Sequence, residues 1–154
     1  MLSQIELGRS VPTVTVLSRI AAAFDLPAAV FLSVGGTGRA TILKREAANL
    51  LRSADGKFVS RALFPFNGAR RTEFYELTVY PGCHYLSDPH RAGTTENLVV
   101  VSGALEVEIL GERHRLSRGD ALHFVADATH AYSNLGPKIA VAYLVIAYVQ
   151  PVSY

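Results

Sequence analysis

Short apolar runs separated by glycine turns fill the chain from residue 41 to residue 149. Many of them alternate, as in the segment Ala104–Leu110, where leucine, valine and isoleucine are separated by glutamates. Successive side chains of a strand point to opposite faces, so this alternation places one face in a core and the other in solvent. Many short strands with turn signals between them are typical of an all-β sandwich or barrel. We therefore expect a mainly β fold with strands over Thr41–Lys44, Lys57–Phe64, Thr72–Tyr80, Leu98–Val101, Ala104–Leu110, His114–Leu116, Ala121–Val125, His130–Asn134 and Ile139–Val149.

Residues 3–32 have a different pattern, which favours helices. Pro12 and Thr13 form a helix start signal. Apolar residues then follow at helical spacing on one face, namely Leu17, Ile20, Ala21 and Phe24. Pro27 interrupts this pattern and leaves room for one further short helix over Pro27–Leu32.

The segment Ser33–Gly38 has the composition of a flexible linker. The sequence thus predicts a helical part over residues 1–33, a linker over 34–40 and a β domain over 41–154. Residues 1–71 carry ten basic and four acidic side chains, a balance of +6, whereas residues 72–154 carry five and nine, a balance of −4. A basic first part suits contact with an anion such as DNA, although ordinary solubility charge would give the same balance.

The chain has a single cysteine, so it can form no intrachain disulfide. It also has no signal-peptide pattern, and no apolar run reaches the ~20 residues that a membrane helix needs. These features predict a cytoplasmic protein that does not enter a membrane.

Two glycine-led segments carry a regular set of polar residues. The first has Gly82, five residues, Asp88-Pro89-His90, five residues, Glu96, six residues and Gly103, and the second has Gly119, ten residues, His130, three residues and Asn134. This spacing resembles the two motifs of the cupin superfamily. The resemblance implies a double-stranded β-helix, which is a jelly-roll barrel. The chain departs from the motifs at Asp88, where cupins have their first histidine, in an extra residue before Glu96, and in a missing Pro-x-Gly turn.

In cupins the motif residues bind metal, and His90, Glu96 and His130 match three of the four ligands of the family. Two imidazoles and one carboxylate suit a divalent metal such as Fe, Mn, Ni or Zn. Alternatively, no cofactor is required: His90 and Glu96 pair with each other or with a small polar ligand, and His130 is an inward histidine whose hydrogen bonds are satisfied. Asp88 could serve as an oxygen ligand or lie in a surface turn. The residues expected to line the ligand pocket are Asp88, His90, Glu96, His130, Tyr132 and Tyr80.

The segment Ser3–Thr13, with the helical spacing that follows it, resembles the latter half of an Xre-type helix-turn-helix domain. In that family the segment ends the recognition helix, and the first two helices are expected before Met1. The resemblance implies DNA contacts from Ser3, Gln4, Glu6 and Arg9 in a complete domain. The alternative is a two-helix arm with a structural role.

A partial helix-turn-helix, a linker and a cupin domain in this order resemble the bacterial helix-turn-helix–cupin regulators. This implies a DNA-binding transcription regulator whose cupin domain senses a small-molecule effector and forms a homodimer on an operator. The alternative is a metal-dependent cupin enzyme, similar to Fe(II) oxygenases and epoxidases, that uses His90, Glu96 and His130. Whether the protein is an enzyme stays open, with the non-catalytic regulator favoured. A third possibility is a binding module that dimerises and nothing more.

Overall fold

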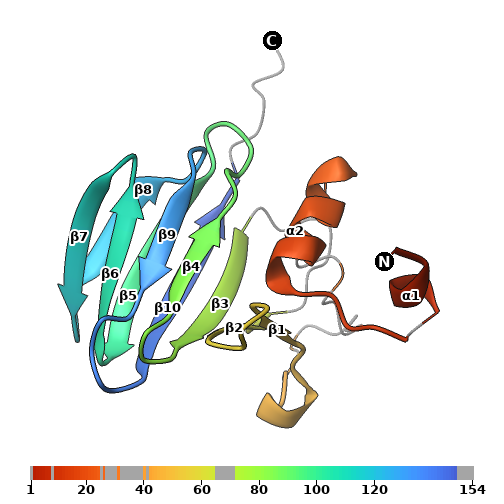
Figure 1. Ribbon diagram of the computed structural model, residues 1–154, viewed down its shortest axis with the longest axis horizontal. Helices are drawn as coiled ribbons and strands as arrows, with labels where there is room; N and C mark the ends of the chain where they lie inside the picture. The colour runs from red at the N-terminus through yellow and green to blue at the C-terminus, as the bar shows by residue number, and fades with distance from the viewer. Residues whose placement is uncertain are drawn as a thin grey trace.

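A computed structural model describes residues 2–7, 9–24, 26, 31, 40, 42–64 and 72–148. Its mainly β architecture (Figure 1) confirms the predicted fold class. The elements of these residues are α1 (Leu2–Glu6), α2 (Val14–Ala23), the 3-10 helix η2 (Arg45–Ala47), β1 (Leu50–Arg52), β2 (Phe58–Ala62), β3 (Thr72–Val79), β4 (His84–Ser87), β5 (Thr95–Ser102), β6 (Ala104–Ile109), β7 (Glu112–Ser117), β8 (Ala121–Val125), β9 (His130–Ser133) and β10 (Ala140–Ala147).

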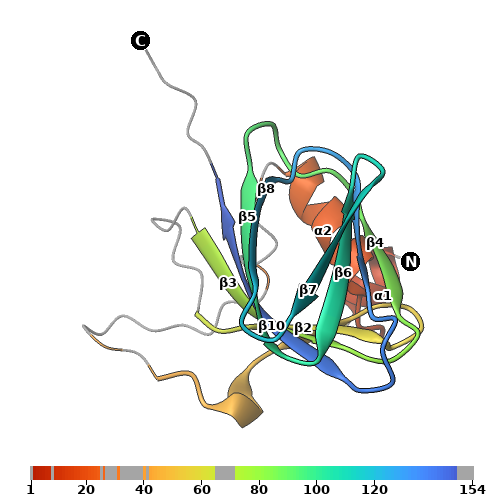
Figure 2. The same cartoon turned by 90° about the vertical axis from the view of Figure 1, so that its left-hand side faces the viewer.

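The strands form two antiparallel sheets that face each other across the core (Figure 2). One sheet has six strands in the order β1-β2-β3-β10-β5-β8, and the other has four in the order β4-β9-β6-β7. Strand β10, the last strand of the described residues, pairs with β3 on one side and with β5 on the other. The chain therefore crosses repeatedly between the sheets, as in a jelly roll.

The core lies between the two sheets and follows from strand alternation. On β3, Tyr75, Leu77 and Val79 point inward and are buried. From the opposite sheet, the ring of Tyr85 stacks on that of Phe58 with 4.0 Å between their centroids. Burial of each such apolar side chain contributes about 1.5–3 kcal/mol, so the contact between the sheets is the main source of stability.

Most predicted strands are confirmed, but two regions differ. The strand expected over Thr41–Lys44 is wrong for the described residues 42–44, which are not in a strand and are followed by η2. The edge strand is instead β1, which pairs with β2. Strand β4 was not expected at all, because its four residues lie within the motif spacing and their sequence does not alternate between apolar and polar residues.

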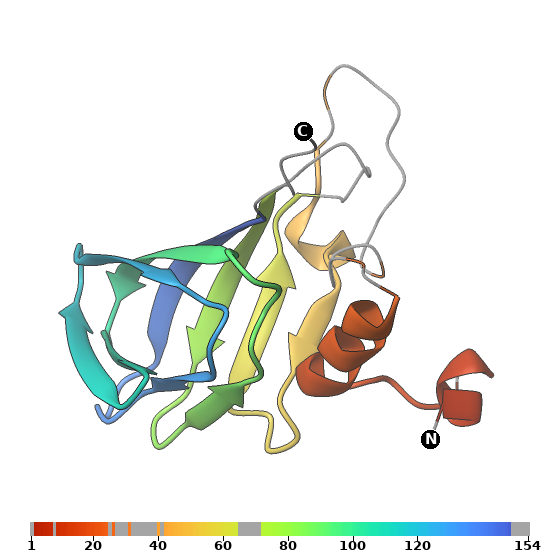
Figure 3. The same ribbon diagram turned by 90° about the horizontal axis from the view of Figure 1, so that it is seen from above.

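Helix α2 lies at the side of the barrel (Figure 3), and the hydroxyl of its Thr15 lies 3.5 Å from that of Tyr85 on the edge strand β4. It begins where the sequence predicts, because the side chain of Thr13 accepts a hydrogen bond from the Val16 amide as an N-cap. Leu17 and Ala21 are buried, and Leu17 belongs to the core cluster of the barrel. A ten-residue helix is marginal alone, so this contact stabilises it.

The expected linker Ser33–Gly38 lies outside the described residues, as does the short helix Pro27–Leu32 except for Phe31. The boundaries 1–33, 34–40 and 41–154 therefore stay predictions. In the part of the chain that the structure describes, no helix is long and apolar enough to cross a membrane.

Candidate metal and ligand site

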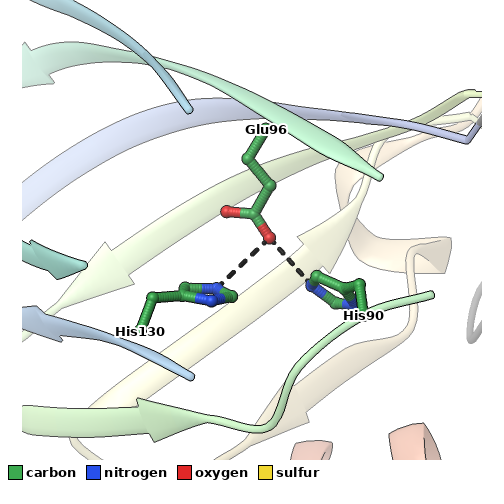
Figure 4. A group of neighbouring side chains, drawn as sticks. All are labelled: His90, Glu96 and His130. Atoms are coloured by element: carbon green, nitrogen blue, oxygen red, sulfur yellow. Dashed lines mark hydrogen bonds and ion pairs between the residues drawn. The ribbon is translucent and has the colours of Figure 1, made fainter. Parts of the chain in front are cut away.

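His90, Glu96 and His130 meet at one end of the barrel (Figure 4). Glu96 Oε1 lies 2.9 Å from His90 Nε2 and 3.5 Å from His130 Nε2. One potential ligand atom from each residue lies within 4.8 Å of the other two. The three residues that the motif spacing singles out are thus brought together, although they come from distant parts of the sequence.

Strand alternation and one loop position these side chains. Glu96 is on the inward face of β5, where its register partners are Phe124 on β8 and Ile146 on β10. His130 begins β9 and points into the barrel. His90 lies in the connection between β4 and β5, and its amide donates a hydrogen bond to the carbonyl of Ala126 at 3.0 Å. The side chains of Glu96 and His130 are 2% and 0% exposed against 23% for His90, so the cluster reaches solvent on the His90 side.

The hydrogen bonds of His130 leave one ring nitrogen without a hydrogen-bond partner. Nδ1 lies 2.9 Å from the carbonyl oxygen of Ala128 and must donate to it. Nε2 is buried and makes no hydrogen bond, since its 3.5 Å contact with the Glu96 carboxylate is an ion-pair distance only. In a neutral ring this nitrogen presents a lone pair to a carboxylate oxygen, and only a proton or a cation between them makes the contact favourable.

The electrostatics of the cluster favour opposite charges. Burial alone would lower the pKa of His130, but the nearby negative charge of the Glu96 carboxylate outweighs burial and raises it. Burial would likewise raise the pKa of Glu96, yet its interactions with His130 and His90 lower it to about 2. The carboxylate is therefore ionised at every physiological pH, which metal coordination and binding of a cationic group both require.

The second oxygen of Glu96 is also bonded. The Tyr132 hydroxyl donates a hydrogen bond to Oε2, and both side chains are buried. Burial and the charge of Glu96 raise the pKa of Tyr132 well above its ordinary value, so the phenol stays protonated and remains a donor. Tyr132, which the sequence places on the pocket wall, thus fixes the orientation of the carboxylate.

The donor set fits a divalent metal. Two imidazole nitrogens and one carboxylate oxygen within 4.8 Å of one another form a cluster in which His130 Nε2 lacks any other partner. Such a set with further positions open is the arrangement of non-haem iron sites, and zinc accepts the same ligands. The fold thus presents the ligands in a form that a metal or a small polar molecule can use.

Two of the residues expected at the pocket lie elsewhere. Asp88 forms an ion pair with Arg19 of α2 at 2.7 Å and is not part of the cluster. Tyr80 directly follows Val79, the end of β3 that pairs with Ala140 of β10. Glu96 is instead in register with Ile146 of β10, which pairs with the opposite end of β3. Along a strand of this length the two ends are ~20 Å apart. Both residues therefore lie away from the three-residue cluster.

Sequence reasoning missed a second buried carboxylate at the cluster end of the barrel. Glu73 is on the inward face of β3, and its register partner Ile146 is also the partner of Glu96. The Tyr75 hydroxyl donates to Glu73 Oε2 at 2.7 Å. The signal was present in the sequence, because Glu73 has the same parity as the apolar inward positions of its strand.

The residues expected to contact DNA lie in and just after α1. The side chains of Gln4, Glu6 and Arg9 are exposed, and that of Ser3 lies outside the described residues. The Arg9 amide donates to the carbonyl of Gln4 at 2.8 Å, which closes the C-terminal end of the helix. These residues are available for contact, and their role in DNA binding stays a prediction.

Two facing antiparallel sheets with an inward His-Glu-His cluster define a cupin, and the family model for the cupin domain (Cupin_2) matches residues 75–147. The HTH-type transcriptional regulator SutR of Escherichia coli (strain K12) is 30% identical over 138 residues, which are 90% of this chain and 73% of that protein. The chain therefore belongs to the helix-turn-helix transcription regulators of the XRE type that carry a cupin domain.

Solved structures agree with this assignment. The cupin domain of an XRE family transcriptional regulator from Enterobacter cloacae matches with a TM-score of 0.59 and 32% identity, over 61% of this chain and 99% of that one. An HTH_3 family transcriptional regulator from Vibrio cholerae matches with a TM-score of 0.72 and 25% identity, over 97% of this chain and 80% of that one. The second similarity includes the helical part as well as the barrel.

Proposed function

We propose that this protein is a DNA-binding transcription regulator whose cupin domain binds a small effector at the His90, Glu96 and His130 cluster. The observation that carries the proposal is the buried His130 Nε2, which has no hydrogen-bond partner. This nitrogen lies beside the ionised Glu96 carboxylate, and the chain belongs to a family of regulators. A buried polar atom without a partner is costly, so a site that retains one is suited to receive a ligand.

A divalent metal held by these three residues is the simplest occupant. The two imidazoles are neutral ligands and the carboxylate carries one negative charge, so a bound 2+ ion would keep a net charge of +1. That charge would favour an effector with an anionic oxygen group. The proximity of the three ligand atoms and the orphaned nitrogen of His130 support this occupancy.

DNA binding is proposed for the helical part. The side chains of Gln4, Glu6 and Arg9 are exposed, and the protein is similar to named transcription regulators over this region. A homodimer is also proposed, since two copies would place their helical parts on two half-sites of a palindromic operator.

The experiment uses the full-length protein with a pool of random duplex DNA and with fragments of its own genome. We expect selection of one palindromic sequence, and an affinity for it that changes when Co²⁺ or a metabolite pool is added. Arg9→Gln should weaken binding, whereas Arg113→Gln, on the exposed β7 strand, should not. A protein that selects no sequence and retains no ligand by calorimetry would contradict the proposal.

A metal-dependent enzyme is the second candidate, because the same convergence of two histidines and one glutamate favours it. Thiol chemistry is not part of this candidate, since burial raises the pKa of Cys83 to about 11. Protein purified without chelators should then contain one metal per chain and should consume oxygen in the presence of a metabolite pool. Protein that binds Fe(II) and effector but consumes no oxygen would exclude the oxygenase.

A further inference from the structure

An ion pair joins α2 to the loop that carries His90. Arg19 Nε donates to Asp88 Oδ2 at 2.7 Å, and Nη2 donates to Oδ1 at 3.4 Å. Asp88 lies two residues before His90, at the position where the cupin motif has its first histidine. Its side chain is bonded to the helix and not to the cluster. The residue that departs from the motif is thus the one that contacts the helical part.

The connection from Asp88 to His90 is short and stiff. Pro89 has a fixed φ and restricts the backbone of the residue before it. His90 is held by the hydrogen bond that its amide donates to the carbonyl of Ala126 and by the 2.9 Å contact of its ring with Glu96. A displacement of His90 within the cluster therefore moves Asp88, because the single residue between them cannot absorb it.

A second path of packed side chains runs in parallel. The Tyr132 hydroxyl donates to Glu96, and the Tyr132 ring lies 5.7 Å from that of Phe58. Phe58 stacks on Tyr85 at 4.0 Å, and the Tyr85 hydroxyl lies 3.5 Å from the hydroxyl of Thr15 on α2. The cluster and the helix are thus connected by contiguous contacts on two sides, one polar and one aromatic.

We infer that the Arg19–Asp88 ion pair couples the state of the His90, Glu96 and His130 cluster to the position of α2. The role of this coupling rests on the proposed function, in which effector binding in the barrel changes the DNA-binding part through the ion pair. The side chains of Arg19 and Asp88 are 69% and 46% exposed. An exposed pair is weak, so a ligand needs only a modest preference for one state to make or break it.

The test is a double-mutant cycle read by hydrogen exchange on the full chain, without effector or operator. Glu96→Gln perturbs the cluster, and Asp88→Asn removes the ion pair at nearly constant shape. We expect Glu96→Gln to change the exchange rate of the α2 amides about threefold in the wild-type background. In the Asp88→Asn background, where the aromatic contacts alone remain, the change should be clearly smaller. Tyr132→Phe is a milder perturbation of the cluster and should give the same pattern if Glu96→Gln unfolds the barrel.

Arg113→Gln is the matched control. It breaks the 3.0 Å ion pair between Arg113 and Glu108, in which the two side chains are 65% and 36% exposed. Arg113 is on β7, at the edge of the four-stranded sheet opposite to β4. The response of α2 to Glu96→Gln should be unchanged in this background. Exchanging the two charges, by Arg19→Asp together with Asp88→Arg, should restore the response of α2 that Asp88→Asn reduces. A response of α2 that is equal with and without the Asp88 carboxylate would overturn the inference.

A titration with Co²⁺ separates this inference from the proposed function. If Co²⁺ binds the wild type and Asp88→Asn equally and the α2 exchange changes in neither, the coupling is wrong although the sensor proposal stands. If Co²⁺ does not bind but the cycle is non-additive, the coupling is supported although metal binding is not.

Discussion

Tyr132 donates a hydrogen bond to Glu96 across the inside of the barrel, between residues 36 positions apart in the sequence. Oε2 of the carboxylate is thereby directed to the phenol, and Oε1 is directed to the two imidazoles. The cluster is therefore held in one arrangement before any ligand arrives. Such preorganisation lowers the cost of binding, because little motion is lost when the ligand enters.

Tyr132→Phe should destabilise the protein by about 1–3 kcal/mol, because it leaves one buried carboxylate oxygen without its donor. Urea unfolding measures this free energy. Tyr143→Phe is the control, since Tyr143 is partly exposed on the outer face of β10 and packs edge-on against the Phe74 ring. Its loss of a hydroxyl should cost less than about 0.5 kcal/mol. Equal costs for the two variants would show that the bond to Glu96 contributes nothing.

Removal of a ligand from the cluster should abolish binding of Co²⁺ or Ni²⁺ in calorimetry. We expect His130→Ala and Glu96→Gln to lower the affinity at least about 100-fold, because each removes one of three ligands. His84→Ala is the control, since His84 is exposed on β4 and its Nδ1 lies 2.9 Å from Ser133 Oγ, apart from the cluster. A metal that binds all four proteins equally would have to occupy another site.

The stability of the metal-free protein should be greatest between about pH 4.5 and 6.5. The pKa of Glu96 is lowered from 4.5 to about 2, so its contribution is complete above 4.5 and is lost as the pH falls toward 2. The pKa of His130 is raised above 6.5, so its contribution is complete below 6.5 and is lost as the pH rises through the raised value.

Urea unfolding across pH 2.5–8.5 checks both limbs of this pH dependence. Both should be reduced in Glu96→Gln and kept in His114→Gln, which changes a half-buried histidine of β7 that lies outside the cluster. Metal affinity should instead increase as the pH rises above 6.5, since the metal replaces the proton on His130. A metal affinity that is constant over this range would contradict the assignment of His130 as a ligand.

Two glycine turns give a matched pair for the packing of β10. Gly103 has a φ of +74°, and a Cβ there would lie 2.8 Å from the Ala140 Cα and the Ile139 oxygen. Gly111 has a φ of +85° with nothing within 4 Å of the added atom. Gly103→Ala should cost about 3 kcal/mol or more, whereas Gly111→Ala should cost about 1 kcal/mol. Thermal unfolding compares the stability of the two variants. A loss of stability in Gly103→Ala no larger than that in Gly111→Ala would contradict the close approach of Gly103 to Ala140.

The order of the strands along the chain was largely predictable because alternation and glycine turns are local signals. Their arrangement into sheets was available only through the resemblance to cupins, since β10 pairs with β3 and β5 from distant sequence. Strand β4 could not be found, because it has four residues and its two apolar residues, Tyr85 and Leu86, are adjacent, so its sequence does not alternate between apolar and polar residues. The expected strand Thr41–Lys44 failed for a related reason, since four residues carry too little pattern.

The three-residue cluster was predicted from the sequence, whereas the positions of Asp88 and Tyr80 were not. The resemblance to the cupin motifs identified His90, Glu96 and His130, and the structure brings these three residues together. The ion pair of Asp88 with Arg19 was not predictable, since it depends on how α2 lies against β4 and joins residues 69 positions apart. Contacts of that kind follow from packing and leave no periodic trace in either segment.

The central place of β10 has a consequence for synthesis of the protein. Until residues 140–147 leave the ribosome, β3 and β5 have no strand between them, and each has an open hydrogen-bonding edge. The nascent barrel is therefore exposed to wrong pairing from the synthesis of β5 until that of β10. Only when β10 pairs with β3 and β5 are these two edges protected from aggregation. A premature stop before Ala140 should therefore yield insoluble protein and not a smaller folded domain.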